Sequence, residues 1–197
     1  MLAEFDRGRA AGFKYFTLIA GDVGAYGQDL GSSIAELLRE MFRREGDFHL
    51  NLKDFDPRWL VQYRRELVPL FAANAARIAH MSIPLQSGSE TVLDRMKRGH
   101  TAADFRDTLL ELQRACPTLP RADTHVLLGF PGESEGEFAE TVAFLRAVPF
   151  RKFDIYLYND RPKTPASTMP DKVPYPTILA RARRLRREFP QQAMICY

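Results

Sequence analysis

Short apolar runs alternate with amphipathic helical patterns along the chain, and this alternation restricts the possible folds more than any other feature. Five runs have the length of strands, at 13–20, 48–52, 78–83, 124–128 and 153–158. In the segments between and after them, apolar residues recur at intervals of three or four, as in helices with one buried face. Strands that alternate with helices in this way form a parallel sheet or barrel. The sequence therefore predicts an α/β protein.

Helix starts can be read from pairs of polar residues. Ser33 with Glu36, and Ser134 with Glu137, have the spacing of a capping box, and Thr101 is a good N-cap for a long helix. Further helices are expected around 59–71, before residue 96, and at 178–189. The last of these has an apolar stripe, and its arginines at 181, 183, 184, 186 and 187 are expected mainly on the outside.

Two cysteines in 197 residues are too few for a disulfide framework or for a self-contained zinc or iron-sulfur site. Cys116 falls at core spacing in its helix and is expected to be a buried residue, and no metal ligand is predicted. The N-terminus carries acidic residues where a signal peptide is basic, and no apolar run reaches the length of a membrane span. A soluble, cytoplasmic protein is expected. The net charge of +3 is too small to indicate a nucleic-acid partner by itself.

Ligands of β-α barrels lie at the carboxyl ends of the strands, and four such ends here have unusual residues. They are the glycine-rich segment 21–27, the segment 84–89 with one amide and two hydroxyls, the turn 129–133 and the segment 158–161. Taken singly, each also has a simpler reading as a turn or a helix cap. The arginine-rich last helix could likewise contact RNA phosphates or simply be a solvated face.

Together these segments resemble the radical S-adenosylmethionine (SAM) domain of methylthiotransferases. Gly21–Asp29, Pro-Leu-Gln-Ser-Gly-Ser at 84–89, Gly-Phe-Pro-Gly-Glu at 129–133 and Arg-Pro-x-Thr-Pro-Ala at 161–166 follow that family's order and spacing. The first segment is most similar to the branch that methylthiolates threonylcarbamoyladenosine in transfer RNA (tRNA).

The resemblance implies one partial radical SAM domain over 1–197, with a C-terminal helix and tail from about 170. It implies that SAM binds on a [4Fe-4S] cluster and is cleaved to a 5′-deoxyadenosyl radical. The resemblance leaves the catalytic residues unknown. It assigns SAM contacts to nine residues: Gly21 and Asp22 near the amino group, Gln86, Ser87 and Ser89 near the ribose or carboxylate, Arg98 at the carboxylate, and Gly129, Phe130 and Tyr158 around the adenine.

The chain departs from the family pattern at the cluster. The family holds its cluster with Cys-x-x-x-Cys-x-x-Cys, and this spacing does not occur here. We therefore expect a partial (β/α) barrel that lacks the first β-α unit, a fragment unable to bind the cluster alone, completed by a missing N-terminal segment or another polypeptide. The alternatives are a non-catalytic nucleotide-binding or interaction module, and a radical SAM enzyme acting on a ribosomal protein, a peptide or a small molecule.

Overall fold

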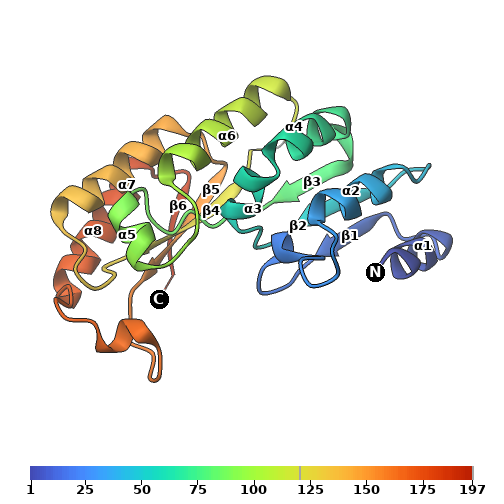
Figure 1. Ribbon diagram of the computed structural model, residues 1–197. Coiled ribbons are helices and arrows are strands. Elements are labelled where there is room, and N and C mark those ends of the chain that lie inside the picture. The colour runs from blue at the N-terminus through green and yellow to red at the C-terminus, as the bar shows by residue number, and fades with distance from the viewer. Residues whose placement is uncertain (120, 197) are drawn as a thin grey trace. The chain divides into compact units, whose positions relative to one another are not determined.

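The computed structural model describes residues 1–119 and 121–196 and confirms the predicted α/β class (Figure 1). Its strands form two three-stranded parallel sheets, in the orders β1-β2-β3 and β4-β5-β6. The chain divides into two compact units, each built around one sheet. The first unit contains Met1–Ile83 and Asp107–Ala122, and the second contains Pro84–Arg106 and Asp123–Tyr197. The division falls within helix α6 (Ala102–Ala115).

The first unit carries the sheet β1 (Tyr15–Leu18), β2 (His49–Leu52) and β3 (Ile78–Met81). The helices and 3₁₀ turns outside α6 are α1 (Leu2–Ala10), η1 (Val23–Ala25), α2 (Ile34–Phe42), α3 (Pro57–Gln62), α4 (Arg64–Ala73) and η2 (Ala75–Arg77). Fully buried phenylalanines at 48, 55 and 71 form much of the core. As predicted, α2 begins at Ser33, whose side chain accepts a hydrogen bond from the Glu36 N–H. The helix expected around 59–71 is two helices, because the backbone leaves helical geometry at Tyr63.

The second unit carries the sheet β4 (Asp123–Leu128), β5 (Lys152–Leu157) and β6 (Ala193–Cys196). Its other elements are α5 (Glu90–Arg95), α7 (Glu135–Ala147), η3 (Pro165–Thr168) and α8 (Tyr175–Glu188). The capping box of Ser134 and Glu137 at the start of α7 is confirmed in both directions. Cys116 is buried, as its spacing predicted.

Two features of the second unit differ from the sequence prediction. The strand β6 was not predicted, and it forms because its four residues pair in parallel with β5, with Phe153 opposite Ala193. Arg181 was expected on the outer face of the last helix, but its side chain is only 7% exposed. It is buried because a carboxylate from the loop after β4 reaches it there. No helix in the described part of the chain is long and apolar enough to cross a membrane.

Candidate functional site

A pocket of about 390 Å³ lies in the second unit, at the carboxyl end of β4. Three of the nine residues predicted to bind a ligand line it: Gln86, Arg98 and Phe130. They come from three separate segments of the chain. The remaining wall is formed by Arg95, Met96, Lys97, Leu127, Thr164, Pro165, Ala166 and Met169. We call this cavity the strand-end pocket.

Gln86 is held in the left-handed backbone region, with φ of +67°. Its N–H donates to the carbonyl of His125 at 2.8 Å, and its own carbonyl accepts from the N–H of Leu127 at 2.8 Å. This residue therefore extends the sheet beside β4 while turning the chain. Non-glycine residues with positive φ are uncommon and concentrate at functional sites, where surrounding structure holds them in place. Here, the two backbone hydrogen bonds to β4 supply that support.

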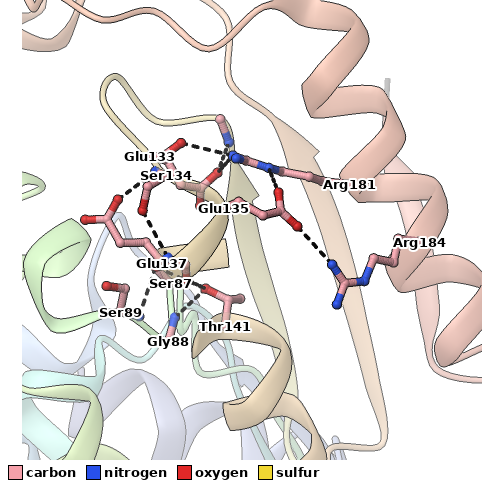
Figure 2. Close-up of polar contacts among 11 residues, drawn as sticks. Ser87, Gly88, Ser89, Glu133, Ser134, Glu135, Glu137, Thr141, Arg181 and Arg184 are labelled. Carbon is pink, nitrogen blue, oxygen red and sulfur yellow. Dashed lines mark hydrogen bonds and ion pairs between the residues drawn. The ribbon is translucent and has the colours of Figure 1, made fainter. Parts of the chain in front are cut away.

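Ser87 and Ser89, also predicted as ligand contacts, are completely buried. The Ser87 hydroxyl lies 3.2 Å from that of Thr141 in α7, and the Gly88 N–H donates to the same Thr141 oxygen at 2.9 Å (Figure 2). The Ser89 hydroxyl lies 3.2 Å from that of Thr91. Both serine hydroxyls thus have partners inside the protein. These contacts hold the 84–89 segment against α7.

Phe130 lines the strand-end pocket, and Gly129 precedes it in the loop after β4. Gly129 has φ of +80°, and a Cβ atom at this position would overlap the side chain of Ile178 in α8. Phe130 packs edge-on against Tyr158, with 5.7 Å between the ring centroids. The Tyr158 hydroxyl donates to Asp160 at 2.7 Å, and burial together with this hydrogen bond raises the pKa of Tyr158. Tyr158 therefore supports Phe130 and is not itself a lining residue of the pocket.

The charged groups of the pocket wall are all basic: Arg95, Lys97 and Arg98. Arg95 donates to Glu137 at 2.9 Å through Nη1, whereas its Nε and Nη2 are buried without a hydrogen-bond partner in the described part of the chain. Sequence reasoning missed Arg95. The signal available was its position three residues before Arg98, at the end of the short helix α5. A pocket with this wall favours a ligand that carries a carboxylate or phosphate.

Gly21 and Asp22, the remaining predicted residues, belong to the first unit. One carboxylate oxygen of Asp22 accepts from Arg58 at 2.8 Å and from Trp59 Nε1 at 2.7 Å. The other oxygen is buried and has no hydrogen-bond partner among the described residues. Asp22 also lines a cavity of about 570 Å³ with Thr17, Ile19 and Tyr26 among its walls. The nine predicted residues thus fall into a group of seven in the second unit and a pair in the first.

The two cysteines do not form a cluster site. Cys116 is 4% exposed and belongs to the first unit, whereas Cys196 is in β6 of the second. Burial is the main cause that raises the pKa of the Cys196 thiol, which disfavours the thiolate that iron requires. No group of three potential metal ligands occurs among the described residues. The residues present therefore do not fit a [4Fe-4S] cluster, which normally needs at least three thiolates.

The parallel strands place this chain among the α/β proteins, a class in which ligands generally bind at the carboxyl edge of the sheet. Comparison with known proteins gives the family. Residues 1–145 match the family model described as the Radical SAM superfamily, and the chain belongs to this superfamily.

Curated relatives confirm the resemblance to methylthiotransferases. The threonylcarbamoyladenosine tRNA methylthiotransferase MtaB of Thermotoga maritima is 33% identical over 87% of this chain and 38% of its own length. The protein of the same name from Bacillus subtilis is 36% identical over 83% of this chain and 36% of its own length. The tRNA-2-methylthio-N(6)-dimethylallyladenosine synthase of Pelotomaculum thermopropionicum is 32% identical over 86% of the chain and 38% of its own length. The matched region is thus under two fifths of each relative.

Solved structures confirm the fold. The radical SAM methyltransferase TsrM of Kitasatospora setae, solved with cobalamin and a [4Fe-4S] cluster, has a TM-score of 0.65 and 19% identity. The match covers 84% of this chain and 32% of TsrM. The archaeal Elp3 of Methanocaldococcus infernus has a TM-score of 0.61 at 15% identity and covers 98% of this chain and 50% of its own. The predicted relation to a partial radical SAM barrel agrees with these similarities.

Proposed function

We propose that the strand-end pocket binds S-adenosylmethionine and that the chain is the SAM-binding part of a methylthiotransferase acting on a tRNA adenosine. The observation that carries the proposal is the convergence of Gln86, Arg98 and Phe130 on one basic pocket in a chain of this superfamily. Two MtaB relatives at 33% and 36% identity support the tRNA branch.

The residues of the pocket suit the parts of SAM. Arg98, with Arg95 nearby, would pair with the methionine carboxylate, because guanidinium groups bind carboxylates in a bidentate manner. Phe130, supported by Tyr158, would pack against the adenine, and Gln86 would hydrogen-bond the ribose. Ser87, Ser89 and Gly129 would act by shaping the wall. Contact between the amino group and Gly21 or Asp22, which belong to the first unit, stays a prediction from the resemblance. When bound, SAM supplies the adenosyl and methyl groups that the superfamily uses.

The cysteines favour a second candidate function for this chain. With two cysteines, one of them buried, the chain does not have the ligands for a cluster. We propose no radical step through these residues. A non-catalytic module that binds an adenosyl nucleotide requires the pocket alone, and it is the alternative that this observation supports.

Calorimetric titration with S-adenosylhomocysteine tests the binding proposal without any cluster. We expect Arg98→Gln to weaken binding about tenfold, since a charge-assisted hydrogen bond is lost. The matched control is Arg183→Gln, an exposed arginine of α8 in the same unit. Equal affinity of wild type and Arg98→Gln, or no binding by the wild type, would overturn the proposal.

A further inference from the structure

A buried ion pair joins α8 to the loop that carries Phe130. Arg181 of α8 donates to Glu133 through Nη1, at 2.8 Å from Oε2 (Figure 2). The Glu133 side chain is completely buried, and that of Arg181 is 7% exposed. The same Nη1 lies 3.2 Å from the backbone carbonyl of Glu133. One guanidinium therefore binds both the side chain and the backbone at the end of the loop.

The carboxylate of Glu133 closes the loop on itself. Its Oε2 atom also accepts the N–H of Gly129 at 2.7 Å, so the first residue of the five-residue loop and the Arg181 guanidinium donate to the same oxygen of the last residue. Gly132 adds a backbone hydrogen bond to the carbonyl of Asp171 at 2.8 Å. Phe130 lies between these fixed points, and its ring lines the strand-end pocket. The position of that ring thus depends on the geometry of Glu133.

Arg181 is itself held from two sides. Its Nε donates to Glu135 at 3.2 Å, and its guanidinium lies over the ring of Phe138, 5.4 Å from the centroid. Glu135 also accepts from Arg184 at 2.9 Å. Arg184 is more exposed, at 44% against 7% for the Arg181 side chain, so it provides a natural comparison. Both arginines contact Glu135 and Phe138, and Arg181 in addition donates to Glu133.

A buried ion pair of this kind contributes little net stability, because removing both charges from water costs free energy. Burial opposes ionisation and raises the pKa of Glu133, although Gly129 and Arg181 lower it. Apolar residues of similar volume often replace a buried ion pair without loss of stability. Apolar residues cannot replace the Glu133 carboxylate oxygen, which accepts hydrogen bonds from Gly129 and Arg181 and so fixes both ends of the loop. This directional role explains the pair better than stability does.

We infer that Arg181 is a positioning residue that acts through Glu133 to fix the 129–133 loop and hold Phe130 in place for the adenosyl group. The identity of the ligand in this inference rests on the proposed function, whereas the role of Arg181 in fixing the loop does not. It assigns a binding role to a helix that contributes no lining residue to the pocket. The ligand effect is indirect, since Arg181 does not line the pocket.

The test combines a spectroscopic and a binding measurement on the whole chain. The variants are Glu133→Gln, Arg181→Lys, and the double variant Glu133→Gln with Arg181→Met. The double variant replaces a single Arg181→Met, which would leave the buried Glu133 carboxylate unpaired and could prevent folding. The control is Arg184→Met. Amide proton–nitrogen spectra report Gly129 and Phe130, and calorimetry reports the dissociation constant for S-adenosylhomocysteine.

We expect the Gly129 amide proton to move upfield in the double variant, because a charged acceptor is lost. Binding of S-adenosylhomocysteine should weaken about three- to tenfold, which is within the range for residues that act without touching a ligand. Arg181→Lys should change both the Gly129 signal and the affinity less than the double variant does, and Arg184→Met should change neither. Unchanged Gly129 and Phe130 signals in a folded double variant would overturn the inference, as would shifted signals with unchanged affinity.

The two proposals fail in different ways. If the wild type does not bind S-adenosylhomocysteine, the proposed function is wrong, and the amide signals alone then decide whether Arg181 fixes the loop. If the wild type binds and the variants bind equally well, the pocket stands and the positioning role of Arg181 is wrong.

Discussion

Single residues in the second unit show how local backbone geometry determines the pocket. Gly129 combines a positive φ with a close approach by Ile178, so both its conformation and its lack of a side chain are needed. Gln86 adopts a positive φ without being glycine, because its backbone is hydrogen-bonded to β4 on both sides. The chain thus uses glycine where a neighbour fills the space and a larger residue where the side chain faces the pocket.

Gly129→Ala should destabilise the protein. The added methyl group meets Ile178 and the residue must keep φ of +80°, so we expect a loss of about 2–4 kcal/mol in the free energy of unfolding. Urea unfolding measures it. Gly136→Ala is the control with the opposite sign. Gly136 is in α7, and a Cβ atom built at this position would lie 3.8 Å from the Ser134 hydroxyl oxygen, which is ordinary contact. Because alanine favours the helix more than glycine does, we expect Gly136→Ala to raise the free energy of unfolding by about 0.5–1 kcal/mol. A loss below about 1 kcal/mol for Gly129→Ala would contradict the argument.

At the scale of elements, the start of α7 joins several segments through Glu137. Its carboxylate accepts the Ser134 N–H at 2.7 Å, the Thr91 hydroxyl at 2.6 Å and Arg95 Nη1 at 2.9 Å. Burial opposes ionisation of this carboxyl, but the hydrogen bonds from Arg95, Thr91 and Ser134 together outweigh it and lower its pKa to about 2. Helices α5 and α7 are thereby tied to each other next to the strand-end pocket.

Glu137→Gln should lower stability in a pH-dependent way. The folded-state pKa is lowered from 4.5 to about 2, so the contribution of Glu137 is present above pH 4.5 and is lost as the pH falls from 4.5 towards 2. At neutral pH we expect the variant to lose up to about 3 kcal/mol. Thermal unfolding between pH 2 and pH 7 checks this, with the exposed Glu140→Gln as control. A difference from wild type that does not shrink on acidification would contradict the assignment.

At the scale of the whole molecule, the number and placement of cysteines limit the chemistry. Anaerobic reconstitution with iron and sulfide should give no stoichiometric cluster and no 5′-deoxyadenosine from SAM, because Cys116 and Cys196 are only two thiols. Iron analysis and product chromatography measure both. Cys116→Ser with Cys196→Ser should behave like the wild type. A cluster that forms in the wild type and is lost in this variant would show that the thiols do act as ligands.

The exposed arginines of α8 give a second prediction at this scale, which rests on the proposed tRNA substrate. Arg183 and Arg187 are exposed residues of α8. If they contact phosphates, Arg183→Gln with Arg187→Gln should reduce the slope of log affinity against log salt by about 1.5. Filter binding of tRNA at several salt concentrations measures the slope. Arg146→Gln, whose charge is already paired with Glu188 at 2.5 Å, is the control. An unchanged slope would contradict contact at α8.

The sequence by itself determined the α/β class, the five strands β1 to β5 and the helix N-caps at Ser33 and Ser134, because these depend on local periodicity and on residues a few positions apart. It also determined the superfamily, since the strand-end motifs occur in a fixed order. Tertiary structure decided what local patterns do not encode. The strand β6 exists only through its pairing with β5, and Tyr63 divides a helix that periodicity predicts as continuous.

The same distinction applies to the site. Motif order indicated Gln86, Arg98 and Phe130, but whether a side chain faces a ligand or the core depends on its distant neighbours. Ser87 has its hydroxyl partner in Thr141, 54 residues away, and Arg181 is buried because Glu133, 48 residues away, supplies a carboxylate. Helical spacing alone placed Arg181 outside. Burial of a charge is decided by the partner that the fold brings to it, and that partner is known only from the tertiary structure.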